Sequence, residues 1–341
     1  METSSAQQNQ NVTSSRMMQE PDEDTVEYVS VLVSTCLLLV MGIYLVVCLL
    51  FYEYRVGIKN RQVGQINRQR NNLSHDRVSD WMRWLCLIAS ILELVRLSLA
   101  IVEIKLGQSS STICDPIAKF QAAFLCAVFT CIYLVLWLRQ RKFYRTPAML
   151  HLSNKIIQFF SSSVIALVVM STLIALLLYM FTRGYHSTVS GCDLQWNSIW
   201  TMLPALLVAL LTVLFQVMLL GLLIYPLHKH RVAMKSVVSN CLHKEIQVIK
   251  RVTLATFVAA VTDGIVGLIT SGIFVSLSHI AQQVIYDVDV LVNILAVICS
   301  FADWRTRMAP FLARQHKIVG TLKRNQIDDQ RSSVTAVSNN L

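Results

Sequence analysis

The polar residues best suited to bind a ligand in this sequence lie inside long apolar runs. Lys119, Gln121, Tyr286, Asp287 and Asp289 all stand within or at the edge of such runs. Charged groups in an apolar medium are costly, and where they occur they are usually paired or functional. We interpret these residues as the candidate ligand pocket and expect Lys119 to share a cavity with Asp287 or Asp289. A structural ion pair without any ligand is the alternative.

The histidines do not suggest metal chemistry. The chain has eight of them, and all fall in loops or at the edges of apolar runs. None are spaced within a run as zinc ligands are. His228 and His230 flank Lys229 in a polar loop, where solvated side chains are the simpler interpretation. We therefore predict no metal, no cofactor and no enzymatic activity.

The runs that carry the candidate residues are long enough to cross a bilayer. The chain is 54% hydrophobic and 15% charged, whereas soluble domains are about 25% charged. A helix needs about 20 apolar residues to span the hydrocarbon, and a helix satisfies its own backbone groups there. We predict an all-α membrane protein, a seven-transmembrane helix bundle. The predicted spans are Val29–Tyr52, Trp81–Ile104, Pro116–Leu138, Ile157–Phe181, Ile199–Leu227, Val252–Leu277 and Val284–Ala302.

The distribution of positive charge predicts how the bundle is oriented. Most of the 30 Lys and Arg residues follow the first, third and fifth spans or lie in the C-terminal tail. Short cytoplasmic loops are enriched in these residues, so we predict the N-terminus outside and the C-terminus inside. The net charge of +10 is explained in this way, without a nucleic-acid partner. We expect a multi-pass protein of the plasma membrane, with the lipid bilayer as a partner.

The predicted bundle is flanked by two polar tails. Residues 1–28 are polar and then acidic, without the apolar core of a signal peptide, and we expect a disordered extracellular tail. Asn11 begins an N-glycosylation sequon in that tail, where the predicted topology would expose it. The transmembrane domain is predicted over 29–303 and a cytoplasmic tail over 317–341.

Two of the nine cysteines fall on the predicted outer side. Cys114 begins the third span, and Cys192 lies in the loop between the fourth and fifth. The outer side is oxidising, and no third cysteine competes there. We expect a disulfide between Cys114 and Cys192, with two free surface thiols as the alternative.

Seven helices, an outer N-terminus and this cysteine pair resemble the rhodopsin-like G-protein-coupled receptors. The family has an arginine at the cytoplasmic end of the third helix, and Arg139 stands at the family's spacing from Cys114. Pro147 matches a common proline of the family's second inner loop. In the seventh span, Asn293 stands in the place of the asparagine of the family's Asn-Pro-x-x-Tyr motif. Trp304 then matches the aromatic that opens the family's short eighth amphipathic helix, which we predict over 304–316.

The chain also departs from the family's motifs. Residue 138 is Leu, so the acidic neighbour of the family's arginine is missing, and Val252–Leu277 contains neither proline nor tryptophan. Asp287 stands where light-sensing relatives have the retinal-linking lysine, which argues against an opsin. Gln121 stands where amine receptors have an aspartate, which argues against an amine receptor.

The resemblance implies a receptor. Such a protein would bind a small molecule, lipid or short peptide in the outer half of the bundle and couple to a heterotrimeric G protein through Arg139. Because the acidic partner is missing, we expect Arg139 to be restrained weakly or by another group. The alternative is a seven-helix membrane protein without G-protein coupling, with a structural, sorting or transport role.

Overall fold

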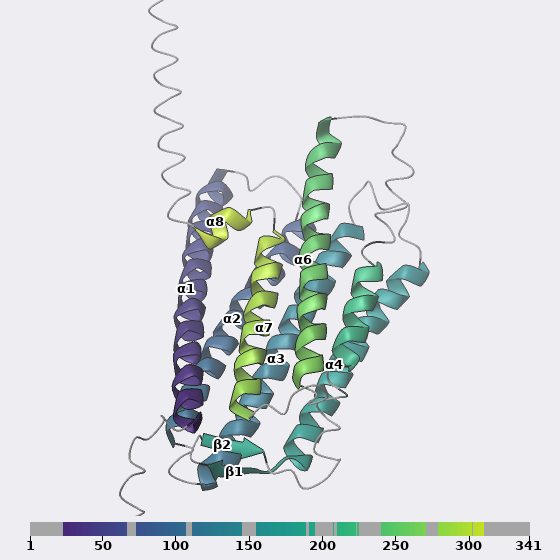
Figure 1. Cartoon of the computed structure of the whole chain (residues 1–341). Coiled ribbons are helices and arrows are strands. Elements are labelled where there is room, and N and C mark those ends of the chain that lie inside the picture. Colours follow the sequence, from purple (N-terminus) through teal and green to yellow (C-terminus); the bar gives the residue numbers. More distant parts are fainter. Residues whose placement is uncertain are drawn as a thin grey trace, which may run out of the picture.

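The computed structural model describes residues 23–66, 73–106, 111–144, 155–188, 191–194, 207, 210–222, 224, 240–270, 279–301 and 303–309. In these ranges the chain is almost entirely helical, and its long helices run side by side (Figure 1). The helices are α1 (Glu23–Ile66), α2 (Leu73–Leu106), α3 (Ser111–Tyr144), α4 (Lys155–Thr182), α6 (Asn240–Thr270), α7 (His279–Cys299) and α8 (Trp304–Met308). A further apolar helix covers Leu210–Leu222.

Five helices of the described ranges are long and apolar enough to cross a membrane. Their candidate spans are Tyr28–Ile58, Val78–Leu106, Ile113–Lys142, Gln158–Thr182 and Ala281–Cys299. These correspond to the first four predicted spans and the seventh. Two shorter apolar helical stretches, Leu210–Leu222 and Thr253–Ile269, lie within the fifth and sixth predicted spans. The chain is therefore a multi-pass helical membrane protein.

A small β-hairpin adds to the predicted all-α fold. Strands β1 (Tyr185–Thr188) and β2 (Gly191–Leu194) follow α4 and pair antiparallel, with Ser187 opposite Cys192. The two strands satisfy each other's backbone groups at the end of the bundle, where the chain leaves the apolar run. The hairpin and α8 lie at opposite ends of the bundle (Figure 1).

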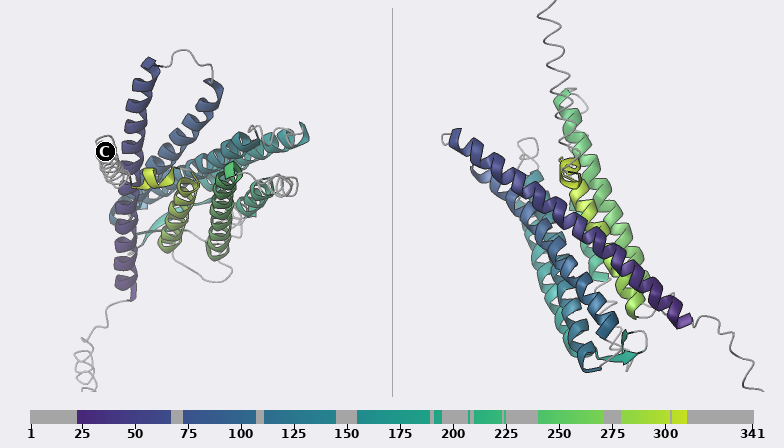
Figure 2. Two further views of the ribbon diagram at one scale, coloured as in Figure 1. Left: turned by 90° about the horizontal axis from the view of Figure 1, so that it is seen from above. Right: turned by 90° about the vertical axis from the view of Figure 1, so that its left-hand side faces the viewer.

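The bundle has two main apolar contact regions. The larger lies where α1, α2, α3 and α7 meet, around Leu49, Leu87, Val128 and Ile298. The second joins α3, α4 and Leu210–Leu222 around Tyr133. Many large apolar side chains of these helices remain exposed, as expected for helices whose outer faces meet lipid. Figure 2 shows that α1 lies at the edge of the bundle and crosses it obliquely.

The ends of the helices differ in part from the predicted domain limits. Helix α1 begins at Glu23 and so includes the last residues of the predicted 1–28 tail. Helix α8 covers Trp304–Met308 of the predicted 304–316 helix, and residues 310–316 lie outside the described residues. Asn11, Pro147 and the 317–341 tail lie outside the described residues.

Candidate functional site

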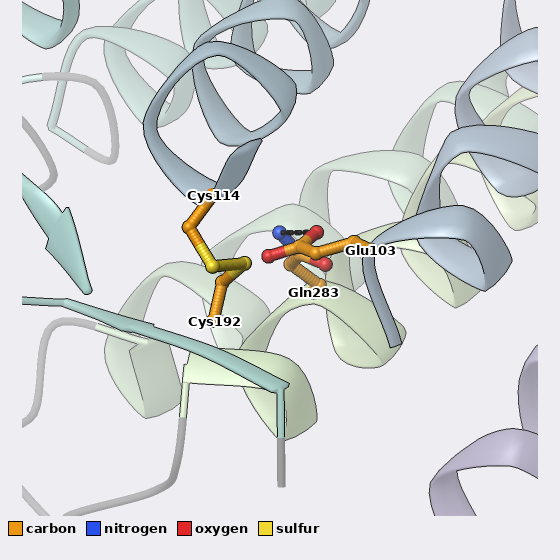
Figure 3. The surroundings of a disulfide bond; sticks show 4 residues. All are labelled: Glu103, Cys114, Cys192 and Gln283. Carbon is orange, nitrogen blue, oxygen red and sulfur yellow. Dashed lines mark hydrogen bonds between the residues drawn. A yellow bond between two sulfur atoms is a disulfide. The ribbon is translucent and has the colours of Figure 1, made fainter. Parts of the chain in front are cut away.

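A disulfide joins the hairpin to the start of α3. The bond links Cys114 and Cys192, whose Cα atoms are 5.4 Å apart, and both side chains are buried. Tyr185 and Ala118 pack around it. Figure 3 shows Glu103, near the end of α2, close to the disulfide. The disulfide therefore holds the hairpin against the end of the bundle.

A cavity of about 50 Å³ lies beneath this hairpin. A space of this size accommodates a few water molecules or a small ligand. Helices α2, α3, α4 and α7 and the hairpin all contribute to its wall. The polar and aromatic residues that line it include Arg96, Gln121, Tyr179, Arg183, Tyr185 and Tyr286.

The predicted pocket residues fall into three groups. Gln121 and Tyr286 line the cavity. Asp287 and Asp289 are buried in the bundle and pair with other helices, as described below. Lys119 is only partly buried and forms an ion pair with Asp115, one turn earlier in α3, at 2.6 Å. This arrangement differs from our expectation that Lys119 shares a cavity with an aspartate of α7, because a carboxylate at i−4 on its own helix is within reach.

Arg183 is the main cavity residue that the sequence analysis missed. Its guanidinium lies over the Tyr179 ring at 4.2 Å. Burial acts to lower the pKa of Arg183, but Tyr179 and Tyr185 outweigh it and raise that pKa, so the side chain stays charged. The sequence position of Arg183 could have identified it, because a cation directly after the predicted outer end of a span is an exception to the positive-inside pattern.

A buried ion triad lies next to this cavity. Arg96 pairs with Glu93 on α2 at 3.2 Å and also donates to Asp287 on α7. The sequence spacing predicted the Glu93–Arg96 pair, since residues three apart share a helix face. The link to Asp287 joins α2 to α7 and places two carboxyl groups, which also hydrogen-bond to each other, against one buried arginine.

A second buried polar cluster joins the helices near the middle of the bundle. The amide groups of Gln216 and Asn293 both donate to the Asp263 carboxylate of α6. Asp289 of α7 lies within interaction distance of Asp263. The sequence showed no partner for Asp263, because its partners come from other segments. Asn293 therefore ties α7 to α6.

At the opposite end of the bundle, Arg139 contacts the chain just after α7. Its guanidinium donates to the backbone carbonyl of Ser300 and lies 5.5 Å from the Phe301 ring centre. Among the described residues, no carboxylate forms an ion pair with Arg139, and its Nη1 is buried without a hydrogen-bond partner. Arg139 is therefore held by a neutral carbonyl and an aromatic face.

Helix α8 is attached to α1 at this same end. Asp303 accepts a hydrogen bond from the Tyr52 hydroxyl and pairs with Arg307 at 2.9 Å. Arg307 lies over the Phe301 ring at 3.9 Å and the Tyr52 ring at 4.7 Å. Burial acts to raise the pKa of Asp303, but the Tyr52 hydrogen bond and the Arg307 charge lower it below the ordinary value of 3.8.

The described residues contain no group of three or more His, Cys, Asp or Glu placed to hold a metal ion. Comparison with known proteins adds no relative: no protein-family model and no curated protein matches the chain. The function of the chain has to be inferred from its own residues and their arrangement.

Proposed function

We propose that the chain is a seven-helix receptor of the plasma membrane, similar to the rhodopsin-like G-protein-coupled receptors. In this proposal a small ligand binds beneath the disulfide-linked hairpin, and a heterotrimeric G protein binds at the Arg139 end. The observation that carries the proposal is that one helix, α3, has Cys114 near one end and Arg139 near the other. A displacement of α3 at the cavity would act directly on the Arg139 contacts.

The topology supports the proposal in two ways. Five long apolar helices and the two shorter apolar stretches would together make seven spans. The sequence segments richest in Lys and Arg come directly after the helix ends on the side of the bundle that carries α8 and Arg139. This enrichment is expected for a cytoplasmic face. The hairpin and its disulfide would then lie outside, in the oxidising compartment.

The contacts of Arg139 suggest how the receptor would switch. In the resembled family this arginine is held near the inner face at rest and lines the G-protein cavity when active. Here a backbone carbonyl and the Phe301 ring take the place of the acidic neighbour. A neutral acceptor holds an arginine less strongly than a carboxylate does, so we expect measurable basal activity.

The test is recruitment of a panel of engineered G-protein probes to the full chain in cells. We expect basal recruitment by wild type and its loss in Arg139→Ala at equal surface level. Arg141→Ala is the matched control, because Arg141 lies on the same end of α3 but is exposed. Its recruitment should equal that of wild type.

The opposite result would identify the other function class. No recruitment by any probe from well-expressed protein, without or with a broad ligand library, would exclude coupling. The chain would then be a seven-helix membrane protein with a structural, sorting or transport role. Equal recruitment by wild type and Arg139→Ala would exclude the proposed role of Arg139.

A further inference from the structure

The cavity beneath the hairpin contains buried donors that make no hydrogen bond of ordinary geometry. Arg183 Nε has no acceptor within the described part of the chain, and Gln121 Nε2, whose side chain interacts with the Glu103 carboxyl group, makes no hydrogen bond of ordinary geometry. Both side chains line the cavity, and they are only 8% and 3% exposed. A buried donor without an acceptor is unfavourable. The cavity therefore favours an occupant that supplies acceptor atoms at this wall.

The cavity wall also has one positive charge that is not neutralised by an ion pair. Arg96 pairs with Glu93 and Asp287, whose carboxyl groups also hydrogen-bond to each other and therefore share a proton, so the triad as a whole is neutral. In contrast, no carboxylate of the described residues lies within ion-pair distance of Arg183, whose close neighbours are Tyr179 and Tyr185. Glu103, the acidic side chain close to the disulfide, accepts a hydrogen bond from Gln283 at 3.2 Å and interacts with Gln121. A single net negative charge on the occupant would balance Arg183.

The chemical groups on the cavity wall further restrict which class of ligand it can bind. A guanidinium presents parallel N–H donors that match the two oxygens of a carboxylate. Tyr179, Tyr185 and Tyr286 provide aromatic surface for a short apolar group. A phosphate group would bring more than one negative charge, which Arg183 alone would not neutralise. The cavity volume of about 50 Å³ restricts the occupant to a few heavy atoms.

We propose that this cavity binds a small organic monocarboxylate, with Arg183 pairing with the carboxylate and Gln121 donating a second hydrogen bond to it. The assignment names the ligand class of the outer site and rests on the proposed receptor function for its physiological role. Binding itself requires no G protein, so it is measured separately from coupling.

The experiment is thermal unfolding of the purified full chain in detergent with short carboxylates. Sodium acetate, propionate and butyrate are compared with acetamide, propionamide and butyramide, with sodium chloride added to the amide samples so that the sodium concentration is the same. Each amide has nearly the shape of its carboxylate but no charge. We expect at least one carboxylate to raise the unfolding temperature by a few degrees, because a ligand that binds the folded state stabilises it. The matching amide should have no effect.

Variants then locate the site. Arg183→Gln should abolish the carboxylate shift, and Gln121→Leu should weaken binding by about tenfold, as expected for one lost hydrogen bond. Lys119→Gln is the control, because Lys119 is a neighbouring cation of α3 that does not line the cavity; its shift should match that of wild type. If Arg183→Gln does not fold, Arg183→Lys replaces it, and weaker binding is expected because the ammonium lacks the fork of donors.

Several outcomes would overturn the assignment. They are no shift with any carboxylate, equal shifts with carboxylates and amides, or an unchanged shift in the Arg183 and Gln121 variants. Carboxylate binding without any G-protein recruitment would instead disprove the receptor function and leave this site standing. G-protein recruitment without carboxylate binding would disprove the carboxylate site and leave the receptor function standing.

Discussion

Arg96 of α2 and Asp287 of α7 form a buried ion pair between two helices that are far apart in the sequence. Glu93 completes the triad from the same face of α2. Both carboxyl groups lie against one guanidinium, and the three side chains are at most 4% exposed. The triad therefore fixes α7 against α2 close to the cavity beneath the hairpin.

Replacing Arg96 should destabilise the protein strongly. Arg96→Met leaves both Glu93 and Asp287 buried without their cation, and breaking a buried pair in this way costs about 3–5 kcal/mol. Glu93→Gln should cost less, because Asp287 still balances the arginine. Thermal unfolding of the purified variants measures the difference.

The control for the triad is Lys105→Met, which removes an exposed cation from the same helix. Its effect on the free energy of unfolding should stay within about 0.5 kcal/mol. Equal losses for Arg96→Met and Lys105→Met would contradict a stabilising role for the triad.

Removing the disulfide should destabilise the hairpin end of the bundle to the same extent whichever of its two cysteines is replaced. Cys114→Ala, Cys192→Ala and the double variant all lose the same link, across a sequence separation of 78 residues. A disulfide typically contributes about 2–4 kcal/mol, so the three variants should show the same lowered unfolding temperature under non-reducing conditions. Cys126→Ala is the control, since Cys126 is a free cysteine of α3. Unequal losses among the three would indicate a role beyond the bond.

Changing Phe301 should raise basal signalling if the receptor proposal holds. The Phe301 ring contacts the guanidinium groups of both Arg139 and Arg307, and Phe301→Leu removes that aromatic face while keeping an apolar side chain. We expect higher basal recruitment of G-protein probes at equal surface level. Phe51→Leu is the control, because the Phe51 ring of α1 makes the same kind of contact with the guanidinium of Arg55. A rise in both variants, or in neither, would count against the specific restraint of Arg139.

Acidification should loosen the attachment of α8 through Asp303. The pKa of Asp303 is lowered in the folded state, so its contribution to stability is present above the ordinary value of 3.8 and is lost as the pH falls through the lowered pKa. Between pH 5 and pH 3, wild type should therefore lose more thermal stability than Asp303→Asn, which lacks this carboxylate. Tyr52→Phe should reduce the loss, because it removes the hydrogen bond that lowers the pKa. Asp80→Asn serves as the control, and parallel pH profiles for wild type and Asp303→Asn would disprove the linkage.

Glycosylation tests the proposed orientation directly. Asn11 and Asn72 each begin a sequon, and only Asn11 is placed outside by the proposed topology. Protein from mammalian cells should therefore lose a glycan in Asn11→Gln and be unchanged in Asn72→Gln, as read from gel mobility before and after enzymatic deglycosylation. A glycan that disappears only in Asn72→Gln would invert the proposed topology.

The sequence alone identified most of the helical framework. Apolar runs such as Trp81–Ile104 and Ile157–Phe181 lie within observed helices α2 and α4, because a membrane-spanning helix is specified by local composition and length. The pair between Glu93 and Arg96 was likewise visible, since residues three apart meet on one helix face. The cysteine pair could be predicted because only two cysteines fall on the proposed outer side.

The tertiary structure decided which polar groups meet across helices. Lys119 forms its ion pair with Asp115, one turn earlier in α3, and not with the aspartates of α7. Asp287 pairs with Arg96. Asp263 accepts hydrogen bonds from the amide groups of Gln216 and Asn293. Arg183 and Gln121 come together only because the hairpin, α3 and α4 close one cavity. Sequence spacing determines contacts within a helix, whereas contacts between helices depend on their rotation and height in the bundle, which packing sets.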